Sequence, residues 1–125
     1  MGIFACYSVV TVRSEYFFYL ITEPSGAPQD VRAMADSSTS IIVEWSPPLV
    51  SERNGIIIQY TVEYAQDSAG ESKSVNTTDN NTSFVVKDLA IFTKYSFKIR
   101  AWNVVGKGPE SEPVYNTTLE DSKCQ

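Results

Sequence analysis

Short runs of alternating apolar and polar residues, each ended by a turn signal, recur along most of this chain. In the clearest run, residues 95–102, every second residue is apolar, and the run is followed by a Gly/Pro-containing segment. A period of two residues is that of a β-strand with one buried face. No segment shows a convincing helical period. The sequence therefore predicts an all-β fold of about seven short antiparallel strands.

The same alternation predicts which side chains form the core. Ile41, Val43 and Trp45 fall on one face of a strand that Pro47 and Pro48 end, since proline cannot donate to a β-ladder. The residues singled out for the core are Trp45, Tyr60, Val62, Leu89, Tyr95, Phe97 and Ile99. Seven short strands in about a hundred residues favour an immunoglobulin-like β-sandwich.

Composition excludes several functions. The chain has 125 residues, a net charge of −5 and no histidine. An acidic chain lacks the basic face that nucleic acid requires, so we expect no nucleic-acid partner. Without histidine, most hydrolase and zinc chemistries lose their central residue, and no carboxylate pair is placed by a motif. We therefore expect no enzyme activity, no cofactor, no metal site and no small-molecule substrate.

Residues 1–23 differ from the remainder, because two apolar runs, Ile3 to Val12 and Tyr16 to Ile21, flank a short charged segment. Neither run reaches the roughly 18 residues of a membrane helix. A signal peptide is poorly matched, since no Lys or Arg precedes the first run. Residue types favour two strands. Three interpretations stay open: the closing hairpin of a preceding module, a poor signal sequence, or unrelated sequence.

The two cysteines, Cys6 and Cys124, lie near opposite ends of the chain. Neither is an internal crosslink of the predicted domain, and their spacing fits no metal motif. An end-to-end disulfide stays open, because the termini of a domain often lie close together. We expect one domain over residues 24–121, with residues 122–125 as a tail.

Turn and strand motifs in residues 26–121 occur in the order and at the intervals of one known family. They are Asp30-Val31, Ser40 to Pro48, Asn54 to Tyr64, Leu89 followed by Tyr95, Asn103 to Gly108, and Ser111 to Val114. With these motifs the chain resembles a fibronectin type III domain. The resemblance implies a seven-stranded, immunoglobulin-like sandwich without a core disulfide.

The resemblance also implies roles for individual residues. Trp45 would fill the core between the sheets, and the Tyr95 hydroxyl would bond to backbone near Leu89 as a tyrosine corner. Ile91 departs from the family pattern, which often has proline at this position. The segments on either side of the domain resemble the linkers of tandem arrays, so neighbouring fibronectin type III modules are expected partners.

Four asparagines lie in N-glycosylation acceptor patterns, more than chance supplies. They are Asn76, Asn80, Asn81 and Asn116. Asn80 and Asn81 are too close together for both to be modified comfortably, and Asn116 falls within a predicted strand. Asn76 and one of Asn80 or Asn81 are therefore the preferred candidates, and the sequons favour a secretory route.

Trp102 falls on the outward side of its strand, beside Lys98 and Arg100. Because Trp and Arg are frequent hot spots of interfaces, these three residues are candidates for binding a protein partner. The alternative is that Trp102 lies under side chains of a neighbouring strand and stacks on Arg100. The Arg-Gly-Asp tripeptide that binds integrins in the resembled family is absent.

Resemblance and sequons together predict a non-catalytic extracellular module, a spacer and protein-binding unit of a cell-surface receptor or adhesion protein, such as a receptor tyrosine phosphatase. A second hypothesis is an intracellular structural module of a giant cytoskeletal or muscle protein, for which a core without disulfides is natural. A third is an accessory domain of a carbohydrate-processing enzyme.

Overall fold

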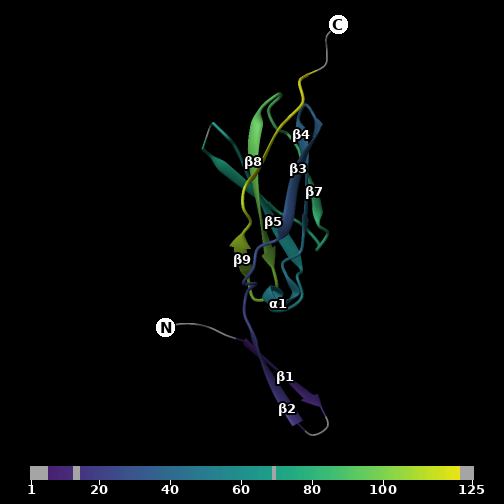
Figure 1. Cartoon of the computed structure of the whole chain (residues 1–125), viewed down its shortest axis with the longest axis vertical. Helices are drawn as coiled ribbons and strands as arrows, with labels where there is room; N and C mark the ends of the chain where they lie inside the picture. Colours follow the sequence, from purple (N-terminus) through teal and green to yellow (C-terminus); the bar gives the residue numbers. More distant parts are fainter. Residues whose placement is uncertain (1–5, 13–14, 69, 122–125) are drawn as a thin grey trace.

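The computed structural model describes residues 6–12, 15–68 and 70–121. Two β-sheets face each other in a sandwich (Figure 1). One sheet has the order β3 (Gln29–Ser37), β4 (Ser40–Ser46) and β7 (Ser83–Val86). The other has the order β10 (Val114–Thr117), β8 (Lys94–Trp102), β5 (Gln59–Gln66) and β6 (Ser72–Asn76), and β9 (Lys107–Glu110) also pairs with β8.

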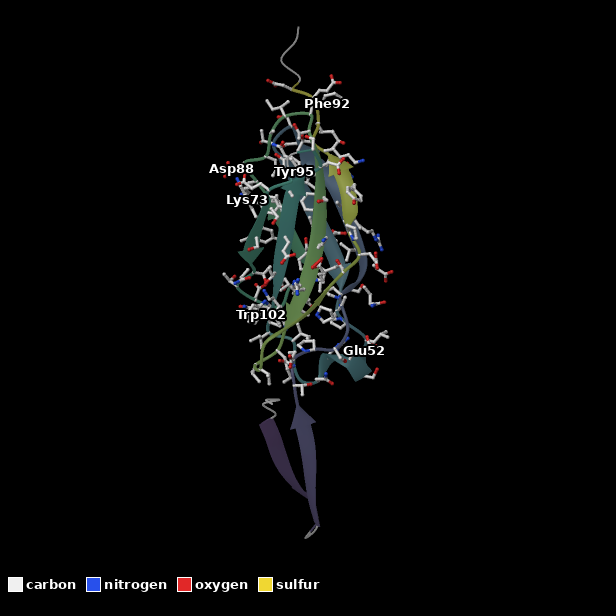
Figure 2. All side chains as sticks on the ribbon, turned by 90° about the vertical axis from the view of Figure 1, so that its left-hand side faces the viewer. Glu52, Lys73, Asp88, Phe92, Tyr95 and Trp102 are labelled. Carbon is white, nitrogen blue, oxygen red and sulfur yellow. The ribbon has the colours of Figure 1, made fainter. Side chains whose placement is uncertain are left out.

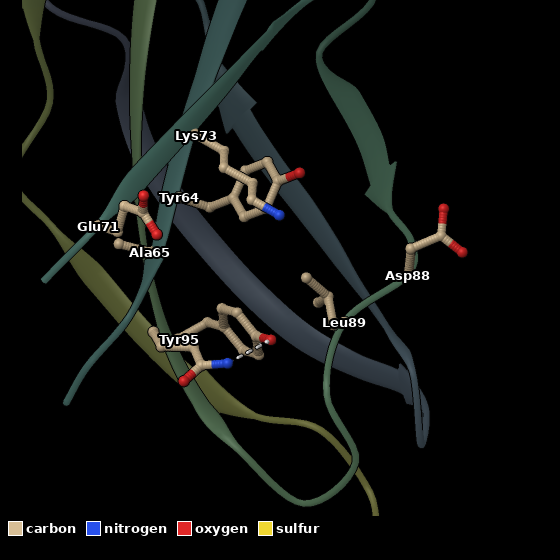
Figure 3. Close-up of a pocket in the computed structure, with 8 residues that line it drawn as sticks. Tyr64, Ala65, Glu71, Lys73, Asp88, Leu89 and Tyr95 are labelled. Atoms are coloured by element: carbon tan, nitrogen blue, oxygen red, sulfur yellow. Dashed lines mark hydrogen bonds between the residues drawn. The ribbon is translucent and has the colours of Figure 1, made fainter. Parts of the chain in front are cut away.

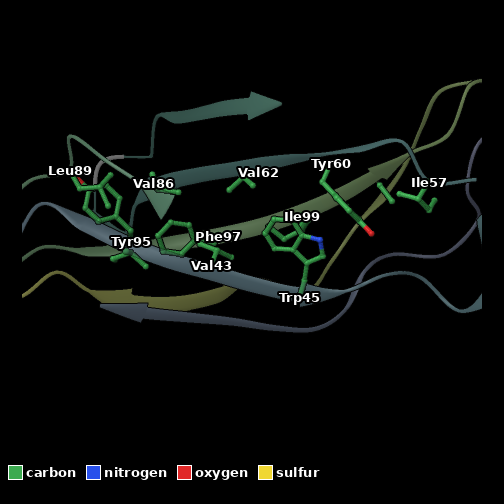
Figure 4. Packing of buried hydrophobic residues seen from close by; sticks show 12 residues of the cluster. Val43, Trp45, Ile57, Tyr60, Val62, Val86, Leu89, Tyr95, Phe97 and Ile99 are labelled. Atoms are coloured by element: carbon green, nitrogen blue, oxygen red, sulfur yellow. The ribbon is translucent and has the colours of Figure 1, made fainter. Parts of the chain in front are cut away.

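Every pairing between these strands is antiparallel, so each strand presents alternate side chains to the space between the sheets. The seven residues expected in the core are each at most 6% exposed. Figure 4 shows them as one layer between the ribbons. The ring centroids of Trp45 and Tyr60 lie 5.1 Å apart at an interplanar angle of 64°, an edge-to-face contact that joins the two sheets.

A hydrogen bond fixes the crossover from β7 to β8. The backbone N–H of Ala90 donates to the Tyr95 hydroxyl at 2.8 Å, which is the tyrosine-corner contact implied by the family resemblance. Gln66 Nε2 lies 3.4 Å from the same hydroxyl, from the adjacent strand β5. Tyr95 therefore ties the crossover to the sheet although Ile91 replaces the usual proline.

The last edge of the sandwich differs in detail from the sequence prediction. The Gly/Pro-containing segment after residues 95–102, a turn signal in the sequence, includes a strand, because Lys107–Glu110 pairs with β8 as β9. Strands β9 and β10 pair with opposite halves of β8 and are separated by residues 111–113. Ser111 bridges the interruption, because its Oγ accepts the Ile99 N–H at 3.0 Å. The seventh strand of the predicted sandwich is thus split into two.

Two connections complete the domain. One turn of helix, α1 (Val50–Arg53), follows β4, where the sequence gives no helical period. Asn54 ends it in the left-handed region with φ 52°, and Gly55 follows with φ 139°. Asn and Gly adopt these angles at low cost, so the chain turns here at the start of the Asn54 to Tyr64 motif.

The N-terminal segment contains two paired strands. β1 (Cys6–Val12) and β2 (Glu15–Ile21) are antiparallel, with Cys6 opposite Ile21. Figure 1 shows this hairpin extending beyond the end of the sandwich that holds α1. The predicted pair of strands is present, whereas its origin stays a prediction. Cys124 and the tail 122–125 lie outside the described residues, and so does any pairing of Cys124 with Cys6.

Candidate functional site

The outward side of the five-stranded sheet holds the candidate binding residues. We name this surface the Trp102 face and define it by Thr61, Glu63, Asn76, Lys98, Arg100 and Trp102. The strand register brings them together, since Thr61 of β5 lies opposite Arg100 of β8 and opposite Asn76 of β6. Figure 2 shows Trp102 towards the end of the sandwich where Glu52 lies.

Two hydrogen bonds in series cross this face. Trp102 Nε1 donates to Thr61 Oγ1 at 2.7 Å, and Thr61 Oγ1 donates to Asn76 Oδ1 at 2.6 Å. Thr61 points outward, yet it is only 3% exposed. Trp102 therefore lies across the neighbouring strand, as one of the two sequence interpretations expected. The cation over its ring is Lys107, whose Nζ is 5.8 Å from the ring centroid, and not Arg100.

The charged side chains of the Trp102 face are paired with one another. Arg100 Nε lies 3.3 Å from Glu63 Oε2, and Arg100 Nη2 lies 2.8 Å from Glu110 Oε2. Lys98 Nζ lies 2.8 Å from Glu110 Oε1. This hydrogen bond is the main cause that raises the pKa of Lys98 and lowers the pKa of Glu110. A partner that binds these cations has to replace existing ion pairs.

The four sequon asparagines occupy different surroundings. Asn76, Asn80 and Asn81 are exposed, at the end of β6 and in the loop that follows, whereas Asn116 is half-buried in β10. Asn116 Nδ2 donates to Ala33 O of the opposite sheet at 2.6 Å. Asn80 and Asn81 also use Nδ2, donating to Ile57 O at 3.3 Å and to Asp79 Oδ2 at 3.0 Å.

Asn103 organises the end of the sandwich at which the chain enters the domain. Its side chain is 2% exposed, and Nδ2 donates to the carbonyl oxygens of Thr22 at 2.6 Å, Arg53 at 3.0 Å and Asn54 at 3.1 Å. Its Oδ1 accepts two backbone N–H groups of its own loop, at 2.9 and 3.2 Å. One side chain thus connects the incoming segment, the end of α1 and the β8–β9 loop.

Further contacts hold the incoming segment. Ser25 N donates to Glu52 O at 2.8 Å, and Asn54 Nδ2 donates to Glu23 O at 3.0 Å. Gly108 lies so close to this segment that a Cβ there would be 2.8 Å from Pro24 O. The chain therefore enters the domain along a fixed path.

The segment that leaves the domain is held in the same manner at the other end. Leu119 N donates to Ser37 O at 3.1 Å, and Leu119 O accepts from Phe92 N at 3.2 Å. The buried Thr118 side chain donates to Ala90 O at 2.7 Å. Hydrogen bonds thus hold both the entering and the leaving segment against the sandwich.

Exposed apolar side chains gather at these two ends. Among residues 22–68 and 70–121, all the large exposed apolar side chains except Met34 and Tyr115 lie there. We name the residues at the α1 end the first apolar end: Leu49, Val50, Ile56, Ile58 and Val104. We name those at the opposite end the second apolar end: Ile91, Phe92 and Leu119. Figure 2 shows Phe92 at the end opposite to Glu52.

One lateral side of the sandwich has a small cleft between the sheets. It has a volume of about 170 Å³ and is lined by Tyr64, Tyr95, Leu89, Lys73, Glu71 and Asp88, among others (Figure 3). A neighbouring groove, lined by Val75, Phe84 and Val86 among others, is larger, with a volume of about 500 Å³. The described part of the chain contains no cluster of metal-ligating side chains. Within it, no helix is long and apolar enough to cross a membrane.

Sequence reasoning located the Trp102 face through the alternation of β8 but missed the two ends. Asn103 entered only as part of a family motif, and its burial depends on the distant segment around Thr22. The exposed Ile56 and Phe92 lie in loops, where periodicity carries no information about neighbours.

Comparison with known proteins places this geometry in a family. Residues 26–117 match the model of the fibronectin type III domain. The chain is similar to the cell adhesion molecule DSCAM of Gallus gallus, 39% identical over 103 residues, and to the tyrosine-protein phosphatase Lar of Drosophila melanogaster, 37% identical over 98 residues. Each alignment covers 78% of this chain and 5% of the relative. The chain thus spans a small fraction of the length of these proteins.

Solved structures agree with the family match. The third fibronectin III domain of human KIAA0343 protein superposes with a TM-score of 0.72 and 27% identity, covering 82% of this chain and 89% of that domain. The FN5 domain of Drosophila Lar superposes with a TM-score of 0.64 and 33% identity, covering 78% of this chain and 99% of that domain. The domain is of the non-catalytic kind found in adhesion proteins and receptor phosphatases, and the chain belongs to the fibronectin type III family.

Proposed function

We propose that this chain is a spacer and protein-interaction module of an extracellular cell-surface receptor or adhesion protein, joined end to end with neighbouring fibronectin type III modules. The observation that carries this proposal is the gathering of exposed apolar side chains at the two ends, where the chain enters and leaves. Contiguous exposed apolar surface marks a place where another protein surface packs.

The fixed connections support the same proposal. A module transmits direction along an array only when its linkers are held by the domain, because a free linker lets the neighbour rotate. Asn103 holds the segment at Thr22, and Ser37 and Phe92 hold Leu119. Each apolar end therefore has a defined orientation towards the adjoining module.

The extracellular location is supported by two observations. Three sequon asparagines, Asn76, Asn80 and Asn81, are exposed. The similar proteins include a cell adhesion molecule and receptor-type phosphatases, in which the matching segment is about one-twentieth of the length. We assign the phosphatase activity to those proteins and propose a non-catalytic role for this module.

The location is tested on the parent protein as the cell makes it. An antibody raised against residues 22–121 is expected to label unpermeabilised cells, and an enzyme that removes N-linked glycans is expected to lower the apparent mass of the detected protein. The same cells after permeabilisation are the control. Labelling only after permeabilisation, with no change of mass, contradicts the extracellular role and favours the intracellular structural module.

A further inference from the structure

We propose that Asn76 carries an N-linked glycan whose first sugars pack on the indole ring of Trp102. This inference rests on the proposed extracellular function, since glycosylation requires the secretory route. It assigns an occupant to the Trp102 face, namely a carbohydrate attached to the same chain. A protein partner bound at Trp102 is the competing occupant and is an outcome of the test.

The availability of the acceptor atom singles out Asn76. A glycan is attached to the side-chain nitrogen of asparagine. In Asn80, Asn81 and Asn116 this nitrogen donates to a carbonyl or carboxylate oxygen. In Asn76 the oxygen Oδ1 accepts from Thr61, while Nδ2 has no hydrogen-bond partner within the described residues. Asn76 therefore presents an oriented amide whose acceptor nitrogen is open to solvent.

The orientation of that amide places the attached sugar beside Trp102. Thr61 Oγ1 lies 2.6 Å from Asn76 Oδ1 and 2.7 Å from Trp102 Nε1, so one hydroxyl connects the two side chains. Because Asn76 and Trp102 point outward from the same sheet, a sugar on Nδ2 starts on the side where the indole lies. The hydroxyl of Thr61, which both side chains contact, keeps the indole within reach of a sugar on Nδ2.

The chemistry of the two surfaces matches. One side of a pyranose ring consists of C–H bonds, and such a surface packs on the negative face of an aromatic ring. Trp102 is only partly buried, so its ring retains surface for this contact. The cations beside it, Lys98 and Arg100, are already paired with carboxylates. A neutral sugar needs no change in these ion pairs and has to displace only the exposed Lys107, whose Nζ lies 5.8 Å from the ring centroid. An acidic protein partner has to break the ion pairs.

The matched variant for the test is Thr78→Ala. Thr78 is exposed and is the hydroxyl residue of the Asn76-Thr77-Thr78 sequon, so this change removes the glycan and keeps Asn76 with its bond to Thr61. The whole chain is secreted from animal cells behind an added signal peptide, with Trp102 or Trp102→Leu, and with Thr78 or Thr78→Ala. Peptide mapping of the four proteins gives the occupancy of Asn76, and thermal unfolding gives Tm.

We expect Asn76 to be occupied and Thr78→Ala to lower Tm by about 3 °C or more when Trp102 is present. In the Trp102→Leu background, the same change is expected to leave Tm unaltered. An equal shift in both backgrounds overturns the contact. An empty Asn76 in a chain that carries a glycan at Asn81 overturns the site, while an extracellular location of the parent protein still stands.

A second readout needs no change at Trp102 and so remains valid if Trp102→Leu fails to fold. Iodide quenches the fluorescence of accessible indoles, and Trp45, the other tryptophan, is 4% exposed and contributes little. Quenching is expected to be stronger in Thr78→Ala than in the glycosylated chain. Equal quenching in the two proteins shows an uncovered ring, which overturns the proposal and leaves Trp102 to a protein partner.

Discussion

The Trp102 face and the two apolar ends differ in whether their side chains have partners within the domain. On the Trp102 face, the indole N–H has an acceptor and both cations have carboxylates. At the ends, Ile56 and Phe92 are 79% and 63% exposed. The polar groups of the Trp102 face are paired within the single domain, whereas the apolar side chains at the ends are exposed to solvent. The difference indicates that the two apolar ends are the surfaces on which a neighbouring module is most favoured to pack.

Among the predicted substitutions, one in the core between the sheets is expected to lower the free energy of unfolding most. Trp45 joins the sheets through its contact with Tyr60, so Trp45→Ala leaves a cavity between them. We expect a loss of about 3 to 5 kcal/mol in the free energy of unfolding, measured by chemical denaturation. A near-neutral result shows that the packing of the two sheets does not depend on this contact, and contradicts the assignment of Trp45 to the core.

The first apolar end depends on a polar side chain. Asn103→Ala removes the donor for Thr22 O and the acceptor for two backbone N–H groups. We expect a loss of about 1 to 3 kcal/mol and faster hydrogen exchange of the β8–β9 loop. The matched control is Asn81→Ala, an exposed asparagine whose removal is expected to change stability little. Equal effects of the two substitutions contradict the role of Asn103 in connecting the incoming segment, α1 and the β8–β9 loop.

The charged pairs of the Trp102 face are expected to contribute less, because they are partly exposed. The hydrogen bond from Lys98 lowers the pKa of Glu110 in the folded chain. A lowered folded pKa stabilises the fold above the unfolded pKa, and this stabilisation is lost as the pH falls through the folded pKa. Glu110→Gln is therefore expected to flatten the acid side of a plot of stability against pH. If stability falls equally at low pH with and without Glu110→Gln, the Lys98–Glu110 pair does not contribute to stability.

Ile56→Lys is expected to have the smallest effect on a single domain. The side chain is 79% exposed, so the free energy of unfolding should stay within about 0.5 kcal/mol of the parent value. Met34→Lys is the matched control, because Met34 is an exposed apolar residue on a strand and not at an end. A large loss with Ile56→Lys shows that the first apolar end is satisfied within the domain.

Much of this fold could be predicted from the sequence, because alternation reports which side of a strand is buried. The inward residues of β8, such as Phe97 and Ile99, are fully buried as their spacing indicates. Alternation does not report what an outward residue touches. Trp102 contacts Thr61 and Lys107, and these contacts depend on strand register and on the pairing of β9.

The structure of the two ends could not be predicted from the sequence for a different physical reason. Asn103 is buried because Thr22 and Arg53, far apart in sequence, converge on it. The pairing of Lys107–Glu110 with β8 was also missed, since Gly and Pro in this segment favour a loop by local preference. Tertiary contacts decide both the burial of Asn103 and the pairing of Lys107–Glu110, and such contacts leave no periodic pattern in the sequence.

Joining two copies of residues 22–121 in one polypeptide tests the end-to-end role most directly. In this protein the second apolar end of the first copy faces the first apolar end of the second copy. We expect a higher Tm than that of the single domain. The increase should be lost when Ile56→Lys is placed in the second copy and retained with Met34→Lys. Equal Tm values for the single and the doubled domain contradict the claim that the ends are built to pack on neighbours.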